Sequence, residues 1–217
     1  MGVYLHGSAV LGDWTAGASD VDVLVIVADD PSKESADRMA NALGAELTCP
    51  GIGLEASVVT AAAAAHPRAP WPFVVHVTTA PEDFKTVRGR PGHGDPDLIL
   101  HYAVARARGW AALGPEPQTL IGAVPDDVVL NQLTRELRWA IEHADATYAV
   151  LNACRALRFR DERVLCAKTA GGDWALERRI ASALVQRAID DRRLGASRPL
   201  DPATVEWVMS VAADLET

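Results

Sequence analysis

Two carboxylates stand two residues apart at the head of an apolar run. Residues 20–27 read Asp-Val-Asp-Val-Leu-Val-Ile-Val, a composition that predicts a β-strand. Because side chains alternate along a strand, Asp20 and Asp22 would point to the same face. Two like charges this close repel each other, so the pair is stable mainly when a divalent cation lies between them. The pattern therefore predicts a metal site at the beginning of this strand.

A Gly-Ser pair lies a short way before these carboxylates. Gly7-Ser8 follows a short apolar strand that starts at Val3. Glycine lets the backbone approach a ligand closely, and the exposed amides with the Ser8 hydroxyl can hold phosphate oxygens. Phosphate groups, a hard cation and paired carboxylates together indicate phosphoryl or nucleotidyl transfer. The alternative interpretation is a turn serine followed by two solvated aspartates.

A third acid interrupts a later apolar strand. Residues 54–59 read Leu-Glu-Ala-Ser-Val-Val, and glutamate is a poor strand residue. Glu55 could face solvent from an edge strand. The functional interpretation is that Glu55 lies beside Asp20 and Asp22, where it assists the metal or, as general base, takes the proton from an attacking hydroxyl.

Composition limits the partners of the chain. Its 217 residues, 49% of them hydrophobic, suffice for one large domain or two small ones. A formal net charge of -8 argues against a nucleic-acid partner and suits a cationic small molecule, although a solubilising surface is the commoner reason for such a charge. Cys49, Cys154 and Cys166 form no CxxC pair, which predicts reduced thiols and a cytoplasmic protein. No apolar run is long enough to predict a membrane partner.

Helix and strand signals divide the chain into two parts. Asp30-Pro31 predicts the start of a helix that Gly44 ends, and residues 74–77 read as an edge strand. From Pro125 onwards, apolar residues recur at helical spacing. A breaker-rich stretch at 115–124 lies between the two parts. We expect one domain over residues 1–118 and a helical one over 119–217.

Three histidines, His76, His93 and His101, stand within and after the Pro- and Gly-rich middle of the chain. Their irregular spacing does not match a metal or phosphate site. We interpret them as surface or packing residues.

One signature and three later segments resemble known enzyme families. Gly7-Ser8 followed by Ser19-Asp20-Val21-Asp22 resembles the signature of the nucleotidyltransferase superfamily related to DNA polymerase beta. Residues 98–115, 145–155 and 167–176 are similar to segments of the streptomycin/spectinomycin adenylyltransferases, in the same order. The resemblance implies an α+β fold, in which a nucleotidyltransferase domain with a mixed β-sheet flanked by helices precedes a C-terminal α-helical bundle.

The same resemblance implies how a nucleotide would bind. ATP would lie between the two domains as co-substrate. Gly7 and Ser8 would hold its phosphates, and Lys168 from the second domain would meet the triphosphate. The carboxylates Asp20 and Asp22, with the third acid of the site, would bind two Mg²⁺ ions.

The resemblance also assigns the acceptor side. Glu55 would deprotonate a hydroxyl of an aminoglycoside such as streptomycin or spectinomycin, which attacks ATP and releases pyrophosphate. Asp145, which by itself reads as a helix N-cap, would face the cationic groups of the drug. Phe84 is the nearest counterpart of an aromatic residue that stacks on streptomycin. Tyr148 replaces an asparagine of the family.

One element of the family has no counterpart. A helix usually precedes the Gly-Ser strand, but here the strand begins at Val3, which leaves a misassigned start and a trimmed fold as alternatives. Three hypotheses follow: an aminoglycoside adenylyltransferase, a nucleotidyltransferase that modifies a protein hydroxyl as in toxin–antitoxin pairs, and a non-catalytic nucleotide-binding protein. The sequence does not indicate an oligomeric state.

Overall fold

The computed structural model describes residues 1–29, 31–45 and 48–216. Contacts divide the chain into two compact units, Met1–Val124 and Pro125–Thr217. The predicted boundary lies slightly earlier, between residues 118 and 119. Among the described residues, no helix has the length and apolar character needed to cross a lipid bilayer.

The first unit is built on a mixed β-sheet. Its elements are β1 (Gly2–Leu5), α1 (Gly7–Leu11), β2 (Val21–Val27), α2 (Lys33–Gly44), β3 (Leu54–Thr60), α3 (Ala61–Ala65), β4 (Val75–Thr78), the 3₁₀ turn η1 (Pro81–Asp83), β5 (Lys85–Arg88), α4 (Leu98–Arg108), β6 (Trp110–Leu113) and α5 (Pro117–Leu120). Within the described residues these strands form one six-stranded sheet in the order β5-β4-β3-β2-β1-β6. β2 and β3 are parallel, and the other neighbours are antiparallel.

Two sequence predictions about this unit are wrong in detail. β4 is not an edge strand, because β5 pairs with its outer side. The helix expected after Pro31 begins at Lys33, where the Ser32 side chain accepts a hydrogen bond from the Ser35 backbone N–H. The proposed cap Asp30 lies outside the described residues. The predicted end at Gly44 is confirmed.

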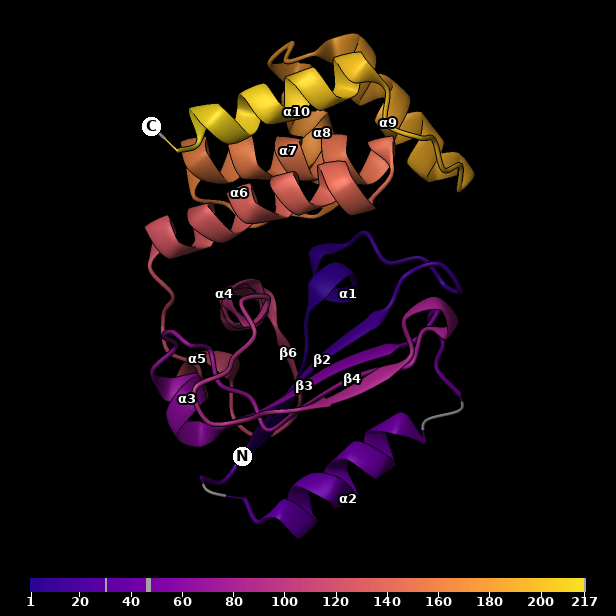
Figure 1. Ribbon diagram of the computed structural model, residues 1–217. Helices are drawn as coiled ribbons and strands as arrows, with labels where there is room; N and C mark the ends of the chain where they lie inside the picture. The colour runs from indigo at the N-terminus through magenta and orange to yellow at the C-terminus, as the bar shows by residue number, and fades with distance from the viewer. Residues whose placement is uncertain (30, 46–47, 217) are drawn as a thin grey trace. The chain divides into compact units, whose positions relative to one another are not determined.

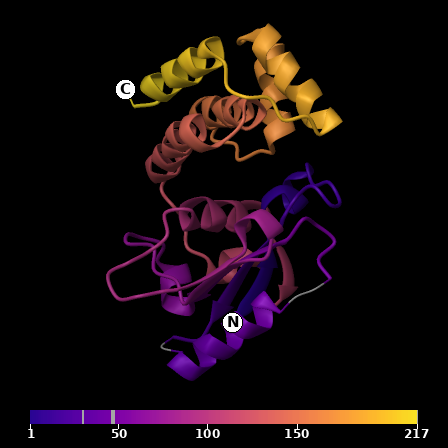
Figure 2. The same ribbon diagram turned by 45° about the vertical axis from the view of Figure 1, so that its right-hand side comes forward.

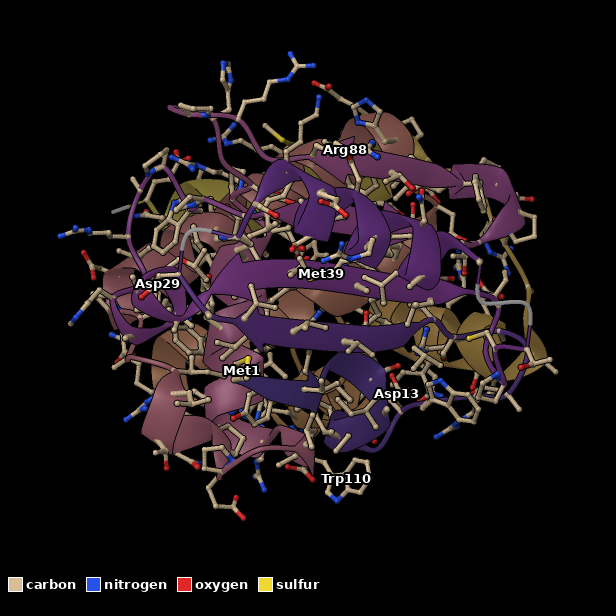
Figure 3. All side chains as sticks on the ribbon, turned by 90° about the horizontal axis from the view of Figure 1, so that it is seen from below. Met1, Asp13, Asp29, Met39, Arg88 and Trp110 are labelled. Carbon is tan, nitrogen blue, oxygen red and sulfur yellow. The ribbon has the colours of Figure 1, made fainter. Side chains whose placement is uncertain are left out.

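Each face of the sheet is covered differently. α2 lies on one face (Figure 1), and Figure 3, which views the unit from that side, labels Met39 over the strands. The alternating apolar residues of the strands meet this helix in a core made of Ala40, Val58, Val75 and Val77 with partly buried neighbours such as Met39. α4 lies on the opposite face (Figures 1 and 2). The strand positions that alternate with the Val58 core therefore face α4, and these include Glu55 and Ser57.

The second unit is helical. Its elements are α6 (Asp126–His143), α7 (Ala146–Glu162), α8 (Lys168–Glu177), α9 (Ser182–Leu194) and α10 (Pro202–Asp214). The central helix is α7, which contacts α6, α8, α9 and α10 and is buried along most of its length. Figure 2 shows the helices of this unit packed around it. The predicted α+β class, with a mixed sheet first and a helical part after it, is confirmed.

Candidate active site

Two of the predicted acids meet across neighbouring strands. Asp22 on β2 and Glu55 on β3 are register partners in the parallel ladder, so their side chains leave the sheet on the same face. The Glu55 side chain is 28% exposed and therefore accessible from solvent. Asp20 stands just before β2, where its carbonyl accepts a hydrogen bond from Trp14 Nε1. The structure thus brings Asp22 and Glu55 together directly.

The Gly-Ser turn lies against the Asp22 carboxylate. Gly7 has a φ of +60°, and a Cβ built on it would lie 1.8 Å from Asp22 Oδ2. The backbone N–H of the preceding His6 donates to the Asp22 carbonyl oxygen over 2.9 Å. Only glycine fits at this position, since any side chain would collide with the carboxylate and strain the backbone.

The hydroxyl of Ser8 is buried. Its Oγ makes no hydrogen bond with any described residue, although a buried polar atom is normally paired. A phosphate oxygen is an acceptor that a serine hydroxyl can satisfy. This side chain therefore fits a phosphate-bearing ligand beside the two acids.

The carboxylate of Asp22 lies in a poorly solvated and negatively charged environment. Burial, followed by the charges of Glu55 and Asp20, raises the pKa of Asp22 to about 7. His101 and a hydrogen bond from the Ser8 backbone oppose this rise. A carboxylate with such a pKa holds its negative charge more readily when a cation is bound nearby.

The donor set suits Mg²⁺, a hard cation that prefers carboxylate oxygens. No three acidic, histidine or cysteine side chains among the described residues are already gathered as a metal site. The fit therefore rests on the Asp22–Glu55 pair, on the electrostatic influence of Asp20, and on the raised pKa of Asp22. Two Mg²⁺ ions bound by these three acids remain a prediction.

Two histidines belong to this site, although the sequence analysis interpreted His101 as a surface or packing residue and did not single out His6. His101 Nε2 lies 3.6 Å from Glu55 Oε1, and the His6 ring lies 4.8 Å from the His101 ring. Burial, and then the neighbouring His101, hold the pKa of His6 well below its ordinary value. His101 lies in the first turn of α4, a helix of mostly buried residues whose N-cap is Asp97. This position was the sequence signal that could have indicated a buried role for His101.

The other two histidines agree with the sequence interpretation. His76 is buried, and its Nδ1 lies 3.0 Å from Ser57 Oγ, so it packs within the sheet. His93 is exposed.

The second unit holds two more of the predicted residues. Asp145 Oδ1 accepts a hydrogen bond from the Tyr148 backbone N–H over 2.8 Å, so its N-cap role is confirmed. Lys168, the first residue of α8, places its Nζ 4.2 Å from the centre of the Tyr148 ring. Trp139, which is 51% exposed, contacts the Tyr148 ring edge-on and stacks on His143. The sequence analysis did not single out this aromatic group, although an exposed tryptophan in a helix was a possible signal.

Two family models match parts of the chain. Residues 1–61 match the family model described as nucleotidyltransferase domain, and residues 119–206 match the one described as aminoglycoside adenylyltransferase, C-terminal domain. The chain belongs to the aminoglycoside adenylyltransferase family. The family predicted from the sequence is therefore confirmed, and it is a family of transferases.

One solved structure shares the fold of this adenylyltransferase-family chain. The spectinomycin adenyltransferase AAD(9) from Enterococcus faecialis, in a crystal structure with ATP and spectinomycin, matches with a TM-score of 0.72 and 15% sequence identity. The match covers 100% of this chain and 92% of that one. No curated protein sequence matches the chain.

Phe84, another predicted site residue, lies on the surface of the first unit. It lies between η1 and the edge strand β5, and its side chain is 64% exposed. Its stacking on a drug, as expected from the adenylyltransferase resemblance, stays a prediction. So do the roles of Ser8, Asp20, Asp22, Glu55, Lys168 and Asp145.

Proposed function

We propose that this protein transfers AMP from ATP to a hydroxyl of an aminoglycoside and releases pyrophosphate. The observation that carries the proposal is the pairing of Asp22 with Glu55 beside a turn whose Ser8 hydroxyl is buried without a partner among the described residues. Membership of the aminoglycoside adenylyltransferase family supports the same reaction. AAD(9), a protein of similar fold, binds ATP and spectinomycin.

ATP binding would use the Gly-Ser turn and, as the family resemblance implies, Lys168. Ser8 would donate its hydroxyl to a phosphate oxygen, and Gly7 would allow the backbone to approach that phosphate. Lys168 would add a positive charge at the triphosphate. Because its Nζ already lies against the Tyr148 ring, the ammonium group has a defined position from which to act.

Asp20, Asp22 and Glu55 would hold two Mg²⁺ ions. Bound magnesium lowers the charge barrier to attack on a phosphoryl group and stabilises the leaving pyrophosphate. The raised pKa of Asp22 supports this assignment, since burial and then the charges of Glu55 and Asp20 disfavour its carboxylate form unless a cation is bound nearby.

Glu55 would act as the general base. Its carboxylate is partly exposed, so an acceptor hydroxyl can approach it and give up its proton as the oxygen attacks the α-phosphorus. Asp22 has no such access from the side of Gly7, whose backbone lies against its carboxylate.

A cationic aminoglycoside suits the acidic character of the chain, whose formal net charge is -8. Asp145 would face the amino or guanidino groups of the drug, and Phe84 would stack on a ring. Streptomycin and spectinomycin are the first acceptors to examine.

The test is to incubate the full chain with ATP, MgCl₂ and a panel that contains streptomycin and spectinomycin. We expect release of pyrophosphate and a mass gain of one AMP on at least one drug, both abolished by EDTA. If ATP is consumed only when a partner protein is added, the acceptor is a protein hydroxyl instead. Binding of ATP without turnover under any of these conditions would refute the transfer reaction.

A further inference from the structure

His101 lies against the proposed base. It stands in the first turn of α4, and its Nε2 lies 3.6 Å from Glu55 Oε1. The His101 side chain is only 14% exposed, which restricts the directions its ring can take. Glu55 therefore has two close neighbours, a like charge, Asp22 on β2, and an imidazole on α4.

The ring of His6 packs against the ring of His101. His6 is 2% exposed, and its ring lies 4.8 Å from the His101 ring at an interplanar angle of 43°. Its backbone N–H donates to the Asp22 carbonyl oxygen, so it is fixed to the same strand end that carries the acids. His6 also directly precedes Gly7 of the phosphate-binding turn.

The surroundings of the ring nitrogens suggest which nitrogen of His101 carries a proton. Among the described residues, His6 Nε2 and His101 Nδ1 are buried and have no hydrogen-bond partner. A neutral imidazole has one N–H donor and one acceptor nitrogen. If His101 directs an Nε2–H at Glu55, its Nδ1 is left as the acceptor nitrogen of a neutral ring.

We propose that His101 is a positioning residue for Glu55, to which it presents Nε2–H, and that it keeps the Glu55 carboxylate turned towards the acceptor hydroxyl. The inference rests on the proposed function, in which Glu55 is the base. A glutamate has three rotatable side-chain bonds, and repulsion from Asp22 favours rotamers that turn away from the site. The Nε2–H of His101, held in a fixed position beside Glu55, restrains that rotation, as supporting partners of a reacting group commonly do.

The first test needs neither ATP nor a drug. Long-range ¹H–¹⁵N NMR of the ligand-free full chain in alkaline buffer reports the tautomer of each histidine. We expect the Nε2–H form for His101 and a clear shift of its ring signals in Glu55→Gln, with no shift in the control Glu82→Gln, an exposed residue of η1. The Nδ1–H form, or signals unaffected by Glu55→Gln, would overturn the proposal.

The second test uses AMP transfer to whichever drug the panel identifies. We expect His101→Leu to lower kcat by roughly 10–100-fold with the KM for ATP little changed, because a partner of a reacting group is lost. His101→Gln, which keeps an N–H donor, should recover part of kcat, and the exposed control His93→Leu should behave as the parent. Equal kcat in all variants, or equal losses in His101→Leu and His101→Gln, would overturn the positioning role.

The two tests separate the two levels of inference. If the parent chain modifies no acceptor but the NMR result holds, the proposed reaction fails and the His101–Glu55 contact stands. If the parent chain transfers AMP but the NMR result is negative, the reaction stands and the positioning role fails. Should His101→Leu not fold, the NMR comparison on the parent and Glu55→Gln still decides.

Discussion

Asp22 and Glu55 occupy the same register position on the adjacent parallel strands β2 and β3. Their side chains therefore share one face of the sheet, although 32 residues of sequence and a helix on the other face separate them. Burial and the charge of Glu55 are the two largest causes of the raised pKa of Asp22, so the carboxyl groups interact through a poorly solvated region. The predictions below depend on this pair and on the turn beside it.

Replacing the proposed base should separate chemistry from binding. We expect Glu55→Gln to keep the fold and ATP affinity but to lower kcat by roughly 10²–10⁴-fold, the usual contribution of a positioned base. Glutamine has nearly the same shape and cannot accept the proton. Steady-state kinetics, with ATP binding followed by calorimetry, make the comparison against Glu82→Gln, which should match the parent. Near-normal turnover in Glu55→Gln would remove Glu55 from the role of base.

A methyl group at Gly7 should damage the site more than its backbone conformation alone predicts. Gly7→Ala would place a Cβ 1.8 Å from Asp22 Oδ2 at a φ of +60°. The matched control is Gly12→Ala, at a φ of +82° with open space around its Cβ. The control should cost only the left-handed strain of about 1–2 kcal/mol, measured by urea unfolding.

In addition to that strain, Gly7→Ala should displace the Asp22 carboxylate, so we expect AMP transfer to fall below detection. Activity assays on both variants at a temperature where both are folded distinguish the causes. Equal activity in the two variants would show that the close approach to Asp22 is not required.

The buried hydroxyl of Ser8 should matter for the ligand and not for the fold. Because Ser8 Oγ bonds to no described residue, Ser8→Ala should leave the melting temperature unchanged or slightly raised. If the hydroxyl meets a charged phosphate, its loss costs about 1.5–3 kcal/mol, which corresponds to roughly 10–100-fold weaker ATP binding. Titration calorimetry with ATP and MgCl₂ measures this. Unchanged affinity would separate Ser8 from the nucleotide.

The sequence predicted the parts of this site that depend on local patterns. Alternation along a strand was enough to identify Asp22, and the misfit of glutamate in an apolar strand was enough to single out Glu55. The helical second unit followed from the spacing of its apolar residues. Register across strands, by contrast, depends on tertiary pairing that no single segment encodes. The family resemblance therefore carried the expectation that the acids converge.

The sequence did not reveal His101 as a neighbour of Glu55. Its role depends on how α4 lies across the sheet, and a histidine in an otherwise buried helix reads equally well as packing. The sequence predicts β4 as an edge strand because the residues of β5 are few, exposed and mostly polar, so that β5 reads as a loop. α2 begins at Lys33 with Ser32 as its N-cap, two residues after the predicted first helical residue Pro31. Helix ends commonly differ by this much between assignments.

The two roles of Asp145 can be separated by one substitution. Asparagine caps helices about as well as aspartate, so Asp145→Asn should keep the hydrogen bond to the Tyr148 N–H and the stability of the chain. It removes the charge that would face a cationic drug, and we expect the KM for the drug to rise roughly 10-fold, as for a lost charged hydrogen bond. Asp201→Asn, at the equivalent cap of α10, is the matched control and should not change KM. An unchanged KM in Asp145→Asn would confine Asp145 to capping.

The bidentate pair of Asp191 and Arg198 should make the second unit sensitive to acid. Arg198 Nε and Nη2 donate to the two carboxylate oxygens over 2.9 and 2.8 Å, and this bonding holds the pKa of Asp191 below its ordinary value of 3.8. Because the folded-state pKa is lower than the unfolded one, the pair stabilises the fold fully above the unfolded pKa, and this stabilisation is lost as the pH falls through the folded pKa. The melting temperature of the full chain should exceed that of Asp191→Asn at about pH 6 and approach it towards about pH 3. The exposed neighbour Asp190 provides the control, since Asp190→Asn should differ little from the parent throughout. A difference between the parent and Asp191→Asn that stays constant with pH would show that the ion pair does not stabilise the fold.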